Sequence, residues 1–276
     1  MTEPLLGVPL PLDGATRLFA IVGDPIAQAG SPGLFNAAFA ARGLHAVLVP
    51  MHVSPDSLPA LLAAFRATRN WDGLVVTVPH KVAVAAYVDE LGVQARRTGA
   101  VNAIRKLPDG RLRGDNFDGA GFVEGLRSKR HHLRQKRILI VGCGGAGRAV
   151  AHAVADENPS SITLYDTDMS AAEALRAAVR AEHPTLTVEV GLPTARGQDV
   201  SINCTSSGMH ADDPLPFDIS DISPSSLVVD IVLKPAVTPL LAQAAQARAS
   251  THEGLFMLSG QVSALVDFFG SGERDR

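Results

Sequence analysis

Short apolar segments rich in Val, Ile and Leu alternate with Ala-rich stretches along most of the chain. Continuous apolar runs of about 4 to 8 residues are typical of strands that are buried on both faces of a sheet. Such runs occur at residues 18–22, 46–49, 74–78, 138–141, 162–165, 200–203 and 227–230. Their alternation with helix-forming segments predicts an α/β protein whose sheets are mostly parallel.

Turn-forming residues mark the first helix. Ser31 is a candidate N-cap, Pro32 suits the first helical position, and Gly43 is a typical stop. We therefore predict a helix over residues 33–42.

The alternation is interrupted at residues 100–114, where two β-like runs flank Pro108-Asp109-Gly110. A Pro-Asp-Gly sequence between two such runs favours a tight turn. We expect an antiparallel hairpin that closes the first sheet.

Length and composition limit the possible classes of protein. At about 150 residues per domain, 276 residues are enough for two domains, and we expect two α/β domains that meet near residues 115–120. With 46% hydrophobic and 19% charged residues, the chain is not disordered. A formal net charge of −3 gives no excess of positive charge with which to hold a nucleic acid.

The sequence also bears on localisation and metal binding. Two cysteines are too few for a disulfide framework, the start of the chain lacks a signal-peptide pattern, and no apolar run approaches the length of a membrane span. A cytoplasmic protein with no membrane partner is expected. The motifs HExxH, CxxC and GxSxG are absent, so we predict no metal site and no serine hydrolase.

A glycine-rich turn follows the predicted strand 138–141. Its sequence, Gly142-Cys143-Gly144-Gly145-Ala146-Gly147, has GxGxxG spacing and precedes a helix-forming run. Glycines there permit a tight turn and let a pyrophosphate approach the N-terminus of the helix. The pattern predicts a nicotinamide dinucleotide site, and the alternative is a plain strand-to-helix turn.

Asp166 ends the next predicted strand, about 20 residues beyond the glycines, where a carboxylate accepts hydrogen bonds from the adenosine ribose. No Arg or Lys lies between Thr163 and Glu173 to bind a 2′-phosphate. These features predict NAD rather than NADP as the preferred cofactor. The alternative is that Asp166 caps a helix that begins near Ser170.

Three further polar residues lie where ligands bind in α/β sheets. Lys81 follows a strand that Pro79 stops, and a lysine at the start of a helix opposes the helix dipole, which favours a functional role over a solvated surface lysine. Asp118 begins another helix and suits an N-cap equally well. Asn102 suits an ordinary hairpin position equally well.

Taken together, these segments resemble the shikimate dehydrogenase family. The matching residues are 23–27, 31–32, 76–81, 99–102, 114–119, 142–147, 203–208 and 254–258 with Gln261. They occur in the family's order from about residue 18 to residue 269 of the chain. The resemblance implies a substrate-binding domain at 1–117 plus 252–276, a Rossmann domain at 118–251, and a site in the cleft between them.

The resemblance also implies roles for individual residues. Lys81 and Asp118 would form the catalytic pair, and which of the two is the formal base stays open. The substrate would contact Ser31, Thr77, Asn102 and Gln261. The cofactor would contact Gly142, Gly144, Gly145, Ala146, Gly147, Asp166, Thr205, Ser206, Gly254 and Met257.

The implied activity is the reversible oxidation of a ring hydroxyl of shikimate or quinate, in which the cofactor takes a hydride and the protein takes a proton. Three positions depart from the family's pattern. Ala29 replaces one of two serines, Phe117 a common Thr, and Leu233 a common Tyr. We therefore expect shikimate to be a poor substrate.

Two alternatives stay open: a dehydrogenase for a different carbocycle, and a nucleotide-binding regulator without catalysis. The expected partner of the enzyme is a small molecule, a cyclic hydroxy acid. The sequence is silent on assembly and is compatible with a homodimer.

Overall fold

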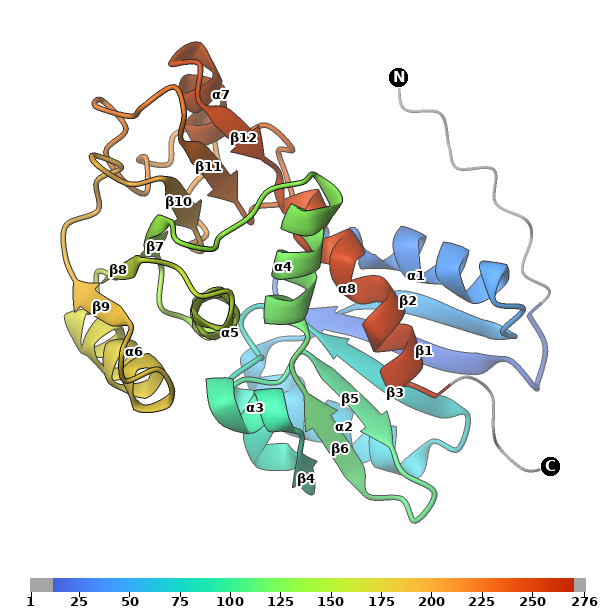
Figure 1. Ribbon diagram of the computed structural model, residues 1–276. Helices are drawn as coiled ribbons and strands as arrows, with labels where there is room; N and C mark the ends of the chain where they lie inside the picture. The colour runs from blue at the N-terminus through green and yellow to red at the C-terminus, as the bar shows by residue number, and fades with distance from the viewer. Residues whose placement is uncertain (1–11, 271–276) are drawn as a thin grey trace. The chain divides into compact units, whose positions relative to one another are not determined.

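The computed structural model describes residues 12–270, which divide into two compact units. The first unit comprises residues 12–95, 101–115 and 262–270, and the second comprises residues 96–100 and 116–261. Each unit is built on one six-stranded sheet covered by helices (Figure 1). The α/β fold class predicted from the apolar runs is confirmed.

The sheet of the first unit is mixed, with the strand order β2-β1-β3-β5-β6-β4. Its strands are β1 (Arg17–Gly23), β2 (Ala46–His52), β3 (Trp71–Val76), β4 (Glu90–Leu91), β5 (Ala103–Lys106) and β6 (Leu112–Asp115). The parallel strands β2, β1 and β3 continue into the antiparallel pair β5 and β6, which is the predicted hairpin. The hairpin does not close the sheet, because the two-residue strand β4 pairs with β6 beyond it.

The helices of the first unit are short. They are α1 (Ser31–Ala41), α2 (Leu58–Ala67), the first half of α3 (Val93–Thr98) and the 3-10 helices η1 (Pro55–Ser57) and η2 (Ala83–Tyr87). Helix α1 begins two residues earlier than predicted, because Gly30 is the N-cap and Ser31 is already helical. Pro32 lies in the first turn, where its missing N–H costs no hydrogen bond.

The sheet of the second unit is entirely parallel, with the strand order β12-β11-β10-β7-β8-β9. Its strands are β7 (Arg137–Val141), β8 (Ser161–Tyr165), β9 (Thr187–Val190), β10 (Val200–Asn203), β11 (Leu227–Asp230) and β12 (Ser250–His252). Its helices are α4 (Asp118–Ser128), α5 (Gly145–Asp156), α6 (Met169–Glu182), α7 (Pro239–Gln246) and the first part of α8 (Gly254–Phe268). The order reverses between β7 and β10, and ligands bind at the carboxyl ends of strands beside such a switch point.

The end of α8 belongs to the first unit and completes its core. The ring of Phe269 lies 5.0 Å from that of Phe19 and 6.4 Å from that of Phe35. Gly73 on β3 leaves the space for this ring, since a Cβ there would lie 2.7 Å from Phe269. Arg42 fixes the same end of α8 by an ion pair with Asp267 at 2.5 Å.

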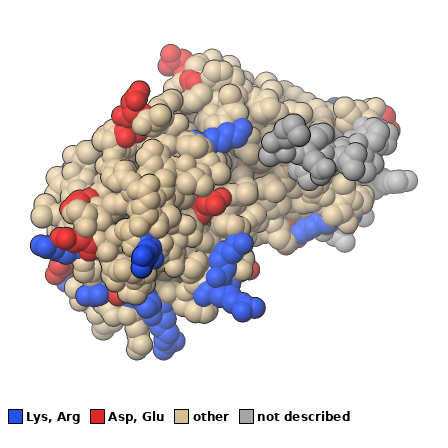
Figure 2. Space-filling model, turned by 90° about the horizontal axis from the view of Figure 1, so that it is seen from above, with Lys and Arg blue, Asp and Glu red and all other residues tan. Residues whose placement is uncertain are grey.

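On the face drawn in Figure 2, the basic and the acidic side chains are interspersed among other residues, without a large area of one sign. Within residues 12–270, none of the helices combines the length and the apolar character that crossing a bilayer requires.

The aromatic contact at the end of α8 gives a test of the fold. Phe269→Ala removes a buried ring from the first unit and should lower the free energy of unfolding by about 3 to 5 kcal/mol. The control is Val93→Ala, because Val93 is 66% exposed and the change should stay within about 0.5 kcal/mol. Chemical denaturation followed by circular dichroism measures both, and equal effects of the two substitutions would contradict this packing.

Candidate functional site

The glycine-rich turn lies at the carboxyl end of β7, and two of its glycines are required by their neighbours. Gly142 has a φ of 97°, and a Cβ on it would lie 2.8 Å from the carbonyl carbon of Cys204. A Cβ on Gly147 would collide with the carbonyl oxygen of Gly142. The backbone of the turn is therefore packed directly against the first turn of α5 and the loop after β10.

Gly144 differs from these two glycines because there is free space where its side chain would be. It is the N-cap of α5, it is exposed, and a Cβ on it would have no heavy atom within 4 Å. The free N–H groups at the start of a helix attract anions, and here the backbone that carries them faces open space. The turn thus fits the pyrophosphate of a dinucleotide.

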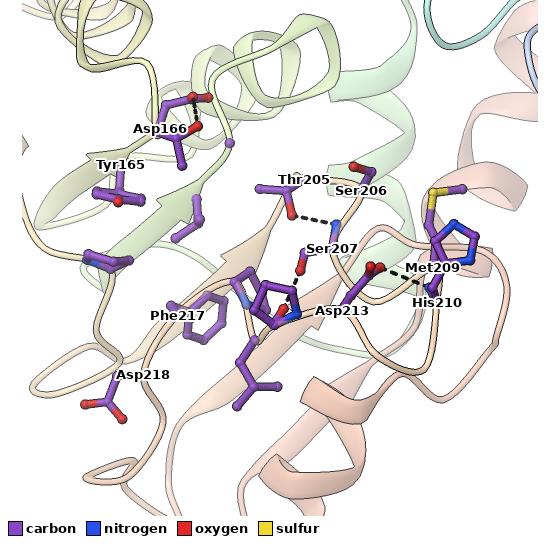
Figure 3. Close-up of a pocket in the computed structure, with 17 residues that line it drawn as sticks. Tyr165, Asp166, Thr205, Ser206, Ser207, Met209, His210, Asp213, Phe217 and Asp218 are labelled. Carbon is purple, nitrogen blue, oxygen red and sulfur yellow. Dashed lines mark hydrogen bonds between the residues drawn. The ribbon is translucent and has the colours of Figure 1, made fainter.

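A cavity of about 800 Å³ lies beside the turn (Figure 3). This volume is in the range typical of small-molecule sites. Tyr165 and Phe217 supply apolar wall, and Asp213 and Asp218 add carboxylates. Four of the predicted cofactor residues meet in its lining, namely Gly142, Asp166, Thr205 and Ser206.

Asp166 is held by backbone groups on both of its carboxylate oxygens. Oδ2 accepts a hydrogen bond from the N–H of Cys143 at 2.6 Å, and Oδ1 accepts one from the N–H of Asp168 at 2.9 Å. Asp168, rather than Asp166, caps α6, and hydrogen bonds from Ser170 lower the pKa of Asp168. The carboxylate of Asp166 therefore braces the glycine-rich turn, and the alternative prediction that it caps α6 is wrong.

The loop after β10 is shaped by one buried amide. Oδ1 of Asn203 accepts hydrogen bonds from the N–H of Thr205 at 2.9 Å and from its hydroxyl at 2.7 Å. The hydroxyl oxygen of Thr205 in turn accepts the N–H of Ser207 at 3.0 Å. This chain of hydrogen bonds sets the position of Thr205 and Ser206 in the wall of the cavity.

Helices α4 and α8 lie side by side in the second unit (Figure 1), and they approach closely through glycines. A Cβ on Gly121 would lie 2.6 Å from the carbonyl oxygen of Met257 and 2.7 Å from Cβ of Gln261. Both residues are nearly buried, with 8% and 7% exposure. The packing of α4 on α8 thus fixes where these two predicted site residues lie relative to Asp118.

Asp118 is buried at the first position of α4, with 2% exposure. The N-cap of this helix is Phe117, so Asp118 does not have the capping role that its sequence position also allowed. Its N–H donates to Oδ1 of Asn116 at 3.0 Å, and Nδ2 of Asn116 donates to the carbonyl of Ala100 at 3.1 Å. Asn116 and Ala100 therefore anchor the start of α4.

In the first unit, three predicted site residues gather at the carboxyl end of β3. The N–H of Val101 donates to the carbonyl of Lys81 at 2.7 Å, and the N–H of Val76 donates to that of Asn102 at 2.7 Å. Thr77 directly follows Val76, so Thr77, Lys81 and Asn102 lie along one edge of the sheet. The amide side chain of Asn102 is 2% exposed.

The structure corrects the expectation about the helix after Lys81 and adds detail on Ser31. The helix after Lys81 is only the five-residue 3-10 helix η2, so the argument from the dipole of an α-helix does not apply. Ser31 is 3% exposed in the first turn of α1. Ala29, two residues before it, offers only its backbone, whose N–H donates to the carbonyl of Ile26 at 3.0 Å.

Sequence reasoning missed the buried polar residues that end the central strands. Asn203 closes β10 and Asp230 closes β11, and both are fully buried at 0% exposure. Thr238, also at 0% exposure, is the N-cap of α7. The signal was available, because a polar residue that ends an apolar run marks the carboxyl edge of a parallel sheet.

The strand order, the glycine-rich turn and the adjoining cavity define a dinucleotide-binding α/β domain of the Rossmann class. Residues 21–104 match the family model described as the shikimate dehydrogenase substrate binding domain. The chain is 40% identical to the shikimate dehydrogenase (NADP(+)) of Rhodospirillum rubrum over 256 residues, which cover 91% of this chain and 90% of that protein. The chain belongs to the shikimate dehydrogenase family, whose members are oxidoreductases dependent on a nicotinamide nucleotide.

Solved structures agree with this assignment. Shikimate 5-dehydrogenase from Thermus thermophilus, in complex with NADP(H) and shikimate, has a TM-score of 0.82 and 29% identity over 92% of this chain and 93% of its own. Quinate dehydrogenase from Corynebacterium glutamicum, in complex with NAD, has a TM-score of 0.80 and 29% identity over 94% of this chain and 95% of its own.

The prediction that NAD is preferred over NADP is wrong by these comparisons. The relative from Rhodospirillum rubrum and three others that are 33 to 36% identical are all named shikimate dehydrogenase (NADP(+)). The prediction took Asp166 to be a ribose ligand. Its position in the sequence did not reveal that both of its carboxylate oxygens also accept backbone hydrogen bonds within the protein. The comparisons overturn the preference for NAD, and the contact of Asp166 with the cofactor stays a prediction.

The glycines of the turn provide a matched pair of variants. Gly144→Ala adds a methyl group where no protein atom lies within 4 Å, at a φ of −72° that alanine tolerates, so the melting temperature should hardly change. The methyl group would stand in the path of the pyrophosphate, and the Kd for NADPH should rise about tenfold or more.

Gly147→Ala, by contrast, should lower both the melting temperature and the affinity, since its Cβ collides with the carbonyl of Gly142. Differential scanning fluorimetry and titration of NADPH fluorescence measure the two quantities. Unchanged affinity in Gly144→Ala would show that the dinucleotide does not approach this part of the turn.

Proposed function

We propose that the protein is an NADP-linked dehydrogenase that interconverts a ring hydroxyl and a ketone of shikimate or a closely similar cyclic polyhydroxy acid. The observation that carries this proposal is the 40% identity to a shikimate dehydrogenase (NADP(+)) over nine-tenths of both chains. Support also comes from the fold shared with the enzyme of Thermus thermophilus, which is described with NADP(H) and shikimate.

The protein's own part in the reaction is the transfer of a proton. The nicotinamide nucleotide, when bound, supplies the site that takes the hydride from the carbinol carbon. The proton of the hydroxyl group must leave in the same reaction, and we assign its removal to Lys81 and Asp118 acting together. In the reverse direction the same two residues return the proton to the carbonyl oxygen.

We assign recognition of the hydroxyl and carboxylate groups to Ser31, Thr77, Asn102 and Gln261. The buried amide of Asn102 can donate to one oxygen and accept from a hydroxyl group, which suits a polyhydroxy ring.

A second candidate function is the oxidation of a related carbocycle such as quinate. The observation that favours it is the similarity to the quinate dehydrogenase of Corynebacterium glutamicum. The replacement of three polar family positions by Ala29, Phe117 and Leu233 favours instead a carbocyclic acid with fewer polar groups at those positions. Each substrate group left without a partner in a buried site costs about 1 to 3 kcal/mol.

A panel of substrates separates these candidates. Initial rates with shikimate, quinate and other cyclic hydroxy acids are measured with NADP and NAD in parallel. The three departures led us to expect a poor rate with shikimate, but the names of four relatives that are 33 to 40% identical favour shikimate and NADP. We therefore expect the highest kcat/KM for this combination, by about tenfold over the others, which corresponds to one well-made hydrogen bond or ion pair. A higher value for quinate would favour the second candidate, and no turnover of any acid would exclude both.

The catalytic pair is tested by alanine substitution. Lys81→Ala and Asp118→Ala should each lower kcat by about three orders of magnitude, and the double variant should be little worse, because residues that act as one unit are not additive. The control is Lys234→Ala, an exposed lysine that should retain full activity. Activity near that of the wild type in either single variant would contradict the assignment.

A further inference from the structure

A buried hydrogen-bond network centred on Asp230 joins the ends of β10 and β11 to the start of α7. Oδ1 of Asp230 accepts hydrogen bonds from Nδ2 of Asn203 and from the N–H of Val232, each at 3.0 Å. Oδ2 accepts the hydroxyl of Thr238 at 2.7 Å. Asp230, Asn203 and Thr238 are each 0% exposed, so this carboxylate is surrounded entirely by protein donors.

The network holds the loop that follows β10. Asn203 donates to the carbonyl of Ser207 at 3.0 Å through the same amide whose oxygen accepts from Thr205. Gly208, at a φ of 106°, packs so that a Cβ would lie 3.4 Å from the side chain of Thr238. Both ends of the loop segment 205–208, which forms one wall of the cavity, are thus tied to Asp230 or its partners.

The same carboxylate also holds the turn after β11. Its hydrogen bond to Val232 fixes the backbone against which α8 begins, because a Cβ on Gly254 would lie 2.6 Å from the carbonyl oxygens of Ile231 and Val232. Gly254 and Met257 of α8 are residues that we assign to the nicotinamide nucleotide. One side chain therefore braces two segments that flank the carboxyl ends of β10 and β11.

We propose that Asp230, with Asn203 and Thr238 as its partners, is a positioning residue for the nucleotide site: it keeps the loop 205–208 and the turn 231–232 in binding geometry. This inference rests on the proposed function, because it takes the nucleotide to occupy the cavity. A role in folding alone would not call for a carboxylate here. Burial penalises the charge and raises the pKa of Asp230, and apolar residues such as Val228 and Val229 fill the rest of the strand.

The test compares two hydrogen bonds at opposite ends of β11. Thr238→Val keeps the volume of the side chain and removes the hydroxyl that donates to Asp230. The control is Ser226→Ala, since Ser226 is 3% exposed at the amino end of β11 and its hydroxyl donates to the carbonyl of Gln198 at 2.9 Å. Ser226→Ala loses one buried hydrogen bond, and Thr238→Val loses two, because the Thr238 hydroxyl also accepts the N–H of Leu241 at 3.3 Å as the N-cap of α7. Only Thr238 is tied through Asp230 to the loop 205–208.

For Thr238→Val we expect the Kd for NADPH, measured by fluorescence titration, and the KM for NADP to rise about tenfold. The kcat at saturating NADP and the KM for shikimate should change by less than about threefold. Thr238→Ser, which keeps the hydroxyl, should restore the wild-type Kd. Ser226→Ala, which loses one buried hydrogen bond, should also lower the melting temperature but leave the Kd unchanged.

The inference is overturned if Thr238→Val lowers the melting temperature as the control does but leaves the Kd and the KM for NADP unchanged. Asp230→Asn, which also keeps the side-chain volume, is measured alongside and replaces Thr238→Val if that variant does not fold. Failure of the proposed function looks different, because the wild-type protein would then bind neither NADPH nor NADH. If the wild type binds NADH but not NADPH, the Kd and KM of each variant are compared with those of the wild type using NADH and NAD.

Discussion

The close packing of Gly142 against Gly147 is the constraint on which the nucleotide side of the molecule depends. Because neither residue has room for a side chain, the end of β7 and the first turn of α5 meet backbone to backbone. The N-terminus of α5 is thereby held at the carboxyl edge of the sheet. The N–H of Gly142 also donates to the carbonyl of Tyr165 at 2.8 Å, which ties the turn to the end of β8. A larger residue at either position would separate these elements.

Polar residues at strand ends complete this edge at the expense of stability. The interior of the sheet is apolar, and yet Asn203 and Asp230 are buried at its rim with no exposure to solvent. Removing a carboxylate from water is costly, and the three donors around Asp230 offset that cost only in one arrangement of the loops. The arrangement of these loops is therefore strongly specified, which suits a site that must be formed before its ligand arrives.

The apolar pattern of the sequence predicted most of the fold. Residues 200–203 and 227–230 are strands with the predicted bounds, because each short segment rich in Val, Ile or Leu ends in a polar residue, Asn203 or Asp230, before a turn. Strand β4 has only two residues, and β12 is exposed at two of its three positions, so neither has a periodic pattern to detect. The N-cap of α1 was misplaced by one residue because the cap is a glycine without a side-chain hydrogen bond.

The candidate site was predictable to the extent that it depends on strand ends. Gly142, Thr205 and Ser206 line one cavity because parallel strands bring their carboxyl ends to the same edge. The structural role of Asp166 was not predictable, since the distance along the chain does not show that its carboxylate accepts hydrogen bonds from Cys143 and Asp168. This role leaves its predicted contact with the cofactor open, because each carboxylate oxygen accepts more than one hydrogen bond.

Substrate selection in the proposed site depends on what the protein lacks as much as on what it retains. Where a polar side chain is replaced by Ala, Phe or Leu, no protein group is left unpaired. The free enzyme therefore loses no stability through an unsatisfied polar group. The cost falls on the substrate, whose hydroxyl or carboxylate oxygen loses a partner that water had supplied. Ala29 and Leu233 therefore penalise a substrate with a polar group at their positions and leave one without it unaffected. A carbocyclic acid with fewer polar groups at those positions would gain in relative kcat/KM, although no new attractive contact is made.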